Sequence, residues 1–443
     1  MKKKFILKFV FVFLFFLIWN LIINVEQNDE IWNYGFAHNI YSGLIPYRDF
    51  NMVITPFYPF IMSLLFHIFG SSMLVFHIEM AFIITITCFL LYDLIKEKIY
   101  ILGIFVIFFS DSLTFPSYNL FLLFLVILLM YLEKKDCNDY LIGIIIGLSI
   151  LTKQSIGIFF ILPSLLYIKS NYKKIIKRVI GLIIPCSIFL FYLLITQSFN
   201  QFMDLCFFGL FDFGVENTAK FNMGYIYFLI YVLVNVFLIF KNKSNINNYY
   251  ALCFSSMMLP LFDVHHVVLS YVILITIFFM SFKFNSRLNY KLIYYVCSIF
   301  IGAFMFISYN KGFKIIFPNK VNHFEYRFLR SDSIKFTNDI VGYINKHNDK
   351  EYLFVVSGAY YYRLVTDTKM SYLDLINYGN FGYNGSDKII KLIKKRKSDN
   401  TVFVISEQDL SENCQADKGA VKYIMNHGKK IGTVQIYDFY ILE

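Results

Sequence analysis

Long apolar runs dominate the first two-thirds of the chain. Each run is bounded by charged or turn-forming residues. The longest runs reach the roughly 20 residues that a helix needs to cross a bilayer, and several are shorter. The pattern predicts about eleven membrane-spanning helices, at residues 5–24, 72–95, 99–110, 118–132, 140–153, 155–168, 179–197, 223–240, 249–262, 267–282 and 291–309.

Two runs near the N-terminus need separate treatment. The first follows the basic residues Lys2, Lys3 and Lys4, but it is long and no small-x-small cleavage site follows it. We therefore expect an uncleaved transmembrane helix and not a signal peptide. The run at 52–70 contains two prolines. We expect it to lie at the outer interface, because that arrangement agrees best with the charges.

From about Asn310 the apolar runs shorten and charges become frequent. Strand and helix patterns alternate here, which is typical of a small α/β domain. The predicted elements are helices at 334–347, 387–397 and 418–426, and strands at 351–356, 401–405 and 432–442. We thus expect two domains, a transmembrane domain at 1–309 with a first outer loop at 25–71, and a soluble domain at 310–443.

The composition supports a membrane protein. Hydrophobic residues make up 58% of the chain and charged residues 16%, whereas soluble domains carry about 25% charged residues. The net charge of +11 does not indicate nucleic acid, because the basic residues cluster between apolar runs. Basic loops remain in the cytoplasm, so their alternation places the N-terminus inside and the C-terminus outside. The fold class is therefore a polytopic α-helical membrane protein with a small extracytoplasmic α/β domain.

The seven cysteines predict neither a disulfide framework nor a metal site, because their number is odd and none are paired at metal-ligand spacing. No glycine-rich nucleotide loop, nucleophile elbow or HExxH pattern is evident. We accordingly expect no cofactor and no mechanism driven by a cytoplasmic nucleotide.

The first outer loop holds the most informative stretch of the sequence. The adjacent acids Asp29 and Glu30 follow the first helix, and Tyr47, Arg48 and Asp49 come soon after. A carboxylate at the membrane edge suits a general base acting on a hydroxyl, and an arginine suits a phosphate. The plainer alternative is an acidic N-terminus of a surface helix. The density of aromatic and charged residues after the acids favours a site.

Lys153 and Gln154 lie between two short apolar runs at the predicted outer side. A charge at that depth is costly unless it has a partner or meets water, so a functional role such as binding a lipid-linked phosphate is a natural hypothesis. A lysine that extends its ammonium group to the interface is an equal alternative.

Two further pairs lie at predicted outer helix ends, His265 with His266 and Tyr118 with Asn119. A histidine there suits a phosphate or a sugar hydroxyl, although an ordinary polar loop is an equal alternative. The second pair follows a proline and a serine, which is typical of a turn that starts a helix. Since the topology places all these segments outside, we expect an outward-facing polar cavity.

At this point the chain resembles the GT-C class of membrane glycosyltransferases, especially bacterial relatives of protein O-mannosyltransferases and of the lipid A aminoarabinose transferase. The residues that carry the resemblance are Asp29-Glu30, Gly43 with Pro46-Tyr47-Arg48-Asp49, Thr55-Pro56-Phe57-Tyr58-Pro59, Phe69-Gly70 and Lys153-Gln154. The Lys-Pro-Pro element of the aminoarabinose transferase is replaced by Ile54-Thr55-Pro56, and Arg48 is expected to substitute for it.

The resemblance implies inverting transfer of a sugar from a polyprenyl-phosphate-linked donor to a hydroxyl of an envelope glycan, lipid or protein, at the outer face of a bacterial plasma membrane. It implies that Asp29 is the base, assisted by Glu30. It also implies that Arg48, Lys153 and one of the two histidines bind the donor phosphate. The remaining substrate-binding candidates are Tyr47, Asp49, Tyr118, Asn119 and Gln154.

Acceptor contacts and other functions remain open from the sequence. A tyrosine- and asparagine-rich segment of the soluble domain is a candidate for contacting the acceptor, although aromatic-rich strands more often belong to a core; its residues are Tyr360, Tyr361, Tyr362, Tyr378, Asn380 and Asn384. The alternatives are a polymerase or ligase of lipid-linked polysaccharides, a transporter or flippase of lipid-linked glycans, and a non-catalytic scaffold. A flippase would favour broken helices with repeat symmetry, and neither is clear in the sequence.

Overall fold

The computed structural model forms two compact units, each built from separate stretches of the chain. The first, which we call the helical unit, comprises residues Met1–Ile23, Phe76–Phe189 and Ala219–Gly312. The second, which we call the mixed unit, comprises residues Asn24–Val75, Leu190–Thr218 and Phe313–Glu443. The predicted division at residue 309 stays a prediction. The structure describes residues 2–22, 29–95, 115–167, 171–210, 212, 222–281, 315–316, 320–327, 329–356, 358–375, 381–396, 400–410 and 417–442.

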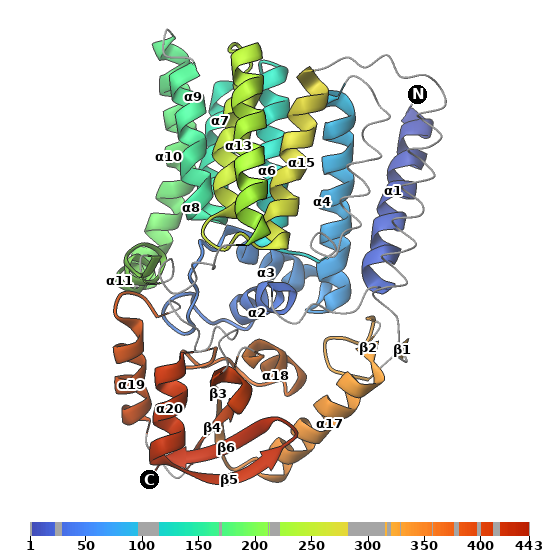
Figure 1. The fold of residues 1–443 in the computed structure, drawn as a ribbon. Coiled ribbons are helices and arrows are strands. Elements are labelled where there is room, and N and C mark those ends of the chain that lie inside the picture. Colours follow the sequence, from blue (N-terminus) through green and yellow to red (C-terminus); the bar gives the residue numbers. More distant parts are fainter. Residues whose placement is uncertain are drawn as a thin grey trace. The chain divides into compact units, whose positions relative to one another are not determined.

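The helical unit consists of helices that run alongside one another (Figure 1). Two helices are divided between the units, since the first residues of α4 and the last residues of α10 belong to the mixed unit. The helices are α1 (Lys2–Ile22), α4 (Met73–Leu94), α6 (Tyr118–Lys134), α7 (Asp139–Thr152), α8 (Gln154–Gly157), η2 (Ile158–Phe160), α9 (Ile161–Tyr167), α10 (Tyr172–Ile195), α13 (Met223–Lys241), α14 (Ile246–Phe254), η4 (Ser255–Met258) and α15 (Val264–Ser281).

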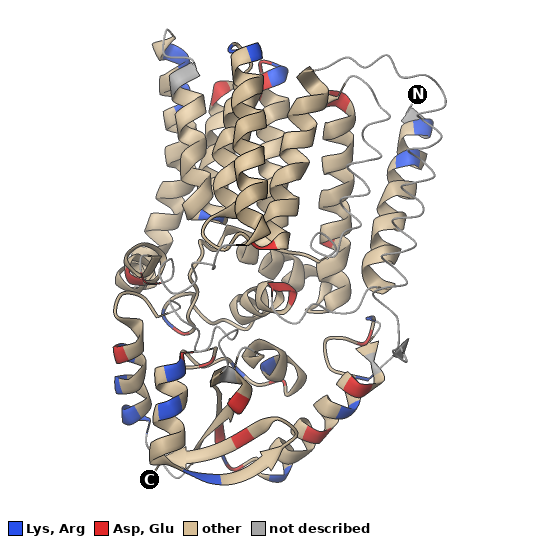
Figure 2. Cartoon of the chain, viewed as in Figure 1, with Lys and Arg blue, Asp and Glu red and all other residues tan. Residues whose placement is uncertain are grey.

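Among the described residues, five helices are long and apolar enough to cross a membrane, namely α1, α4, α10, α13 and α15. In these helices most charged residues gather near the ends and apolar residues fill the length between them, with the buried Glu79 inside α4 as an exception (Figure 2). This is the pattern expected of spans whose ends meet water. The predicted spans at 99–110 and 291–309 fall outside the described residues, and the count of eleven and the orientation stay predictions.

The bounds of helices α10 and α3 differ from the predicted runs. Helix α10 begins at Tyr172, seven residues before the predicted start at 179, because the basic residues that indicated a loop form its first turns. The run at 52–70 contains helix α3 (Phe57–Phe69), which has 13 residues. Such a helix is about 20 Å long, too short for a hydrocarbon core of about 30 Å; its interfacial location stays a prediction.

Glycines allow α7 and α10 to approach each other closely. A Cβ added at Gly143 would lie 2.0 Å from the carbonyl oxygen of Arg178, and one added at Gly181 would lie 2.2 Å from the carbonyl oxygen of Tyr140. Gly147, one turn after Gly143, would meet the neighbouring helix in the same way. Small residues at this four-residue spacing are typical of close helix packing in membranes.

The mixed unit contains helices and a four-stranded sheet of order β3-β4-β6-β5, in which β3 and β4 are parallel and the other pairs antiparallel (Figure 1). Its elements are α2 (Asp29–Tyr41), α3, α11 (Phe199–Met203), η3 (Asp204–Phe208), β1 (Ile315–Ile316), β2 (Leu329–Arg330), α17 (Ser331–Lys346), β3 (Glu351–Phe354), α18 (Ala359–Val365), α19 (Gly385–Lys395), β4 (Thr401–Ser406), η5 (Glu407–Leu410), α20 (Lys418–His427), β5 (Gly428–Val434) and β6 (Tyr437–Leu442).

Strand β4 lies in the interior of the sheet, and its side chains are buried accordingly. All six of its residues are buried, as expected for a strand covered on both faces. Phe403 and Ile405 pack with Ile389 and Ile393 of α19 and with Ile424 of α20 in one hydrophobic core.

Two elements of this unit correct the predictions. The single final strand predicted at 432–442 is a hairpin, because the chain turns back between β5 and β6 at Gln435, which has a φ of 56°. The segment with three consecutive tyrosines, for which no element was predicted, forms helix α18, in which Tyr360 and Tyr362 are buried. This helix packs against α2.

Candidate functional site

The helical unit brings together three of the segments singled out in the sequence. The Lys153 ammonium lies 2.8 Å from Oδ1 of Asn119 and 3.4 Å from Nε2 of His266. It also lies 5.4 Å from the centre of the Tyr118 ring. We call Tyr118, Asn119, Lys153, Asp263 and His266 the lysine cluster.

Helix ends position the members of this cluster. Ser117 caps α6 by accepting a hydrogen bond from the Leu120 amide, which fixes the two residues between them. Lys153 has an extended backbone at the break between α7 and α8. A capping turn and a helix break are local features, so the sequence indicated them correctly. That they meet depends on helix packing.

The third side of the cluster is the start of α15. Oδ1 of Asp263 accepts a hydrogen bond of 2.9 Å from the His266 amide, and both carboxylate oxygens lie 2.8 Å from Nδ1 of the same residue. With the proton on Nδ1, Nε2 accepts from Lys153. Burial opposes ionisation of Asp263, but the hydrogen bonds that it accepts from His266 outweigh this effect and lower the pKa of Asp263 to about 2.

The cluster therefore combines a charged ammonium group, an oriented imidazole and the positive end of an 18-residue helix. Such an arrangement can bind an anionic oxygen. The adjacent candidates lie close by: Nε2 of His265 is 3.4 Å from Nδ2 of Asn119, its ring stacks on Phe115, and Gln154 is buried.

In the mixed unit, the Pro-Tyr-Arg-Asp turn forms a compact structure. The Arg48 guanidinium donates two hydrogen bonds, of 2.9 and 3.1 Å, to the carboxylate of Asp49. The Ile45 amide donates a third. The bonds from Arg48 and Ile45 lower the pKa of Asp49 against the effect of burial. Arg48 is exposed, but its charge is balanced by its neighbour, which weakens its attraction for a phosphate.

Tyr47 has a φ of 69° and is fully buried. Its hydroxyl donates a hydrogen bond of 2.7 Å to the carbonyl oxygen of Ile54, and its ring packs on Phe202. These contacts give Tyr47 a role in holding the loop, and its predicted contact with substrate stays a prediction.

The two predicted acids lie in the first turn of α2 and differ in environment. Glu30 is buried and forms an ion pair with Arg327, with 3.4 Å between Oε1 and Nη2 and both side chains 1% exposed. Asp29 is half-buried. Arg327 was not identified from the sequence, because no local pattern links it to α2. The ion pair ties Glu30 to Arg327, and the roles of Asp29 as base and of Glu30 as its helper stay predictions.

The mixed unit also contains a cavity of about 560 Å³. It is lined by Asp204, Asn384 and Lys388 among others. The Lys388 ammonium lies 2.5 Å from Oδ2 of Asp204, and the Asn384 amide donates to Asp212. Of the predicted acceptor contacts, Asn384 lies at this cavity, whereas Tyr378 and Asn380 fall outside the described residues.

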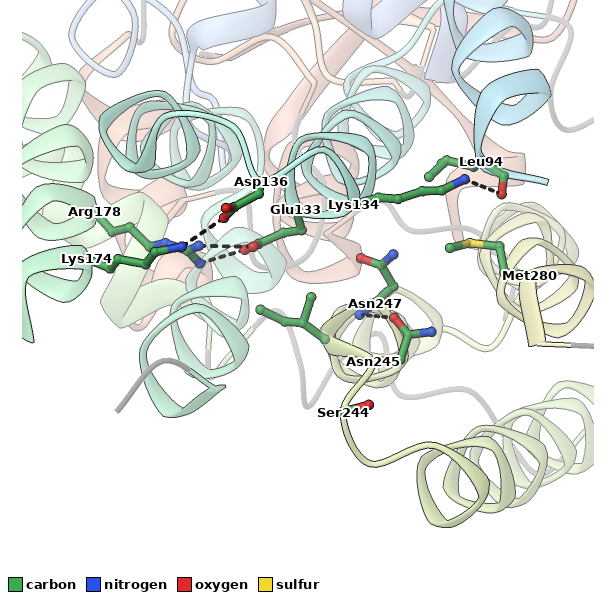
Figure 3. Close-up of a pocket in the computed structure, with 11 residues that line it drawn as sticks. Leu94, Glu133, Lys134, Asp136, Lys174, Arg178, Ser244, Asn245, Asn247 and Met280 are labelled. Atoms are coloured by element: carbon green, nitrogen blue, oxygen red, sulfur yellow. Dashed lines mark hydrogen bonds and ion pairs between the residues drawn. The ribbon is translucent and has the colours of Figure 1, made fainter. Parts of the chain in front are cut away.

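A second cavity, of about 330 Å³, lies in the helical unit. Arg178 points toward Glu133 at its wall (Figure 3). The guanidinium also contacts Asp139 and Ser164, at 2.8 and 2.9 Å. Two carboxylates thus neutralise the cation, so this network suits the joining of helices better than the binding of an anion.

Comparison with known proteins gives a fold relationship. No family model matches the sequence, and no curated protein matches it. The crystal structure of ArnT from Cupriavidus metallidurans bound to undecaprenyl phosphate matches 99% of this chain and 98% of its own, with a TM-score of 0.59 and 9% identity. The chain has the ArnT fold.

The apo structure of the same ArnT agrees, with a TM-score of 0.57, 10% identity and the same coverage. ArnT is a GT-C aminoarabinose transferase, so the predicted resemblance is confirmed at the level of the fold along nearly the whole chain. The roles of the individual site residues stay predictions.

Proposed function

We propose that this chain is a GT-C glycosyltransferase of a bacterial plasma membrane. It transfers a sugar from a polyprenyl-phosphate-linked donor to a hydroxyl of an envelope glycan, lipid or protein at the outer face, with inversion. The lysine cluster carries the proposal, because it gathers a cation and polar groups within a helical unit. The ArnT fold supports it, since ArnT has been crystallised with undecaprenyl phosphate.

In this proposal the lysine cluster binds the donor phosphate. As the bond between the anomeric carbon and the phosphate oxygen breaks, the electron pair stays on the phosphate. Lys153 and the start of α15 stabilise that developing charge, which is worth more in a low-dielectric site than in water. His266, held by Asp263, orients the ammonium group. His265, Asn119, Tyr118 and Gln154 complete the donor contacts.

Asp29 supplies the base. The acceptor oxygen forms a bond to the anomeric carbon, and its proton passes to the Asp29 carboxylate. One displacement of this kind inverts the configuration. Glu30 assists indirectly, because its pairing with Arg327 holds the first turn of α2. Arg48 and Asp49 contact the donor at the loop, and the acceptor binds at the cavity that Asn384 and Lys388 line.

The test is sugar transfer by the purified full-length protein from a panel of polyprenyl-phosphate sugars. We expect transfer by the wild type and a loss of at least about a hundredfold in Asp29→Asn, in keeping with the usual contribution of a general base. Asp332→Asn is a matched control, because Asp332 also lies in the first turn of a helix of the mixed unit. It should transfer like the wild type.

Other outcomes would favour other functions. Retained activity in Asp29→Asn would assign the base elsewhere. If the wild type moves lipid-linked glycans between leaflets without transferring a sugar, the flippase alternative is correct. If it joins lipid-linked repeat units, it is a polymerase or ligase.

A further inference from the structure

Three potential metal ligands from distant parts of the sequence meet in the mixed unit. His38 lies in the last turn of α2, His323 lies between β1 and β2, and Asp367 follows α18. One ligand atom from each of them lies within 4.8 Å of the others. The donors are two imidazoles and a carboxylate, a set that zinc commonly binds.

The surroundings of His323 leave one of its nitrogens available. Nδ1 lies 2.9 Å from the hydroxyl of Tyr34 and 3.3 Å from the carbonyl oxygen of Ser71. Nε2 is buried and has no hydrogen-bond partner. A histidine that ligates a metal commonly donates its other ring N–H to a carbonyl oxygen. The contacts of His323 match that arrangement, with Nε2 as the metal-binding atom.

His38 is held through one nitrogen and has only a long contact at the other, because its Nε2 lies 3.5 Å from Oγ of Ser42. Its Nδ1 lies 2.9 Å from Oγ of Ser71, which is also 2.9 Å from the Tyr34 hydroxyl. Burial, together with the charge of His323, lowers the pKa of His38 to about 4. Burial also lowers the pKa of His323. Burial thus favours the neutral form of both imidazoles, which is the form that binds a metal.

The backbone adds a further observation. His323 and Asp367 both have positive φ values, of 66° and 51°. Non-glycine residues rarely adopt this conformation, although aspartate and histidine do so more often than most. The Asp367 side chain is exposed, so it is free to move the short distance from the present spacing to the roughly 3.3 Å between ligands of a tetrahedral ion with bonds of about 2.0 Å.

We propose that His38, His323 and Asp367 bind one Zn²⁺ or a similar borderline divalent ion, with water as the fourth ligand. Two imidazoles exclude Mg²⁺ and Ca²⁺ as the preferred ions, since these take oxygen ligands. The ion joins α2 to two segments of the C-terminal part of the chain. In that position the ion fastens the element that carries Asp29 to the rest of the mixed unit.

The experiment measures metal binding and does not depend on glycosyl transfer. Full-length protein is purified without a polyhistidine tag, stripped with a chelator, and titrated with zinc and, separately, with cobalt. We expect one tightly bound zinc per chain, visible absorption bands of tetrahedral cobalt, and a higher melting temperature with zinc. Magnesium should produce none of these changes.

Three variants decide the assignment. His323→Gln should abolish the cobalt bands, and Asp367→Asn should weaken zinc binding at least tenfold. His67→Gln is the control, because His67 lies nearby on α3 against Tyr41 and outside the cluster. Since Asp367 is exposed, its variant should melt like the stripped wild type, and zinc should not stabilise it to the same extent.

Two results would overturn the proposal. One is a wild-type protein that binds no zinc at micromolar concentration. The other is zinc binding that is equal in the wild type and in both cluster variants. Either result would leave the glycosyltransferase proposal untouched, because that proposal needs no metal.

Discussion

The buried ion pair between Glu30 and Arg327 allows a quantitative test of what the second acid of α2 does. Both side chains are 1% exposed, so neither charge is stabilised by solvent. Replacing Glu30 by Gln keeps the shape and leaves a guanidinium buried beside a neutral amide. Removing one partner of a buried pair costs about 3–5 kcal/mol. Arg327→Met should cost a similar amount, since it removes the ion-pair partner of the buried Glu30 carboxylate.

The double variant Glu30→Gln, Arg327→Met removes both charges. We expect it to be more stable than either single variant, with a coupling energy of at least about 2 kcal/mol. For a unit of about 200 residues, each kcal/mol shifts the melting temperature by roughly 2–4 °C. The single variants should therefore melt about 10 °C lower than the wild type, and the double variant should recover part of that loss.

The assay is thermal unfolding of purified protein in detergent, followed by sugar transfer at a temperature where every variant is folded. If the pair is structural, the double variant regains both stability and transfer. Additive losses in the melting temperature would refute the reasoning from burial. A stable double variant that transfers no sugar would instead place Glu30 in the chemistry.

Two further predictions concern the helical unit. Lys153→Met should lower kcat/KM for the donor by at least about tenfold, because a charge-assisted hydrogen bond to a phosphate is worth about 1.5–3 kcal/mol. The control is Lys241→Met, since Lys241 is exposed in the last turn of α13, and this variant should have no effect. Equal kcat/KM values in the two variants would exclude the phosphate role of Lys153. Gly143→Val should lower the melting temperature, since even a Cβ there would lie 2.0 Å from a backbone oxygen of α10. Gly342→Ala, in α17 where a Cβ meets nothing within 4 Å, should instead stabilise by up to about 1 kcal/mol, and the reverse order in thermal unfolding would contradict the packing argument.

Local patterns predicted most of the helices and strands. Apolar runs ended at charged or turn residues, and most of the described helices follow them, because a helix in a membrane satisfies its own backbone hydrogen bonds. The errors occurred where a local preference was weak. The basic start of α10 was interpreted as a loop, although Arg178 is held by Glu133 and Asp139. The turn at Gln435 carries no glycine that would have marked it.

The sequence identified several candidate residues, but it did not show which residues they contact. It singled out Lys153, because a charge within an apolar region needs a reason, and it identified the polar helix ends that meet it. It could not supply the contact between Lys153 and His266, since that distance depends on how separate helices pack.

The sequence by itself determined the class of protein, the positions of most of its apolar helices, the mixed character of the C-terminal part and the resemblance to GT-C enzymes. Tertiary structure alone decided that Glu30 is paired with Arg327 and that His38, His323 and Asp367 meet. The reason is physical. Periodicity and capping act over a few residues and are written locally, whereas a buried ion pair or a ligand cluster depends on contacts between segments far apart in the chain, which no local pattern records.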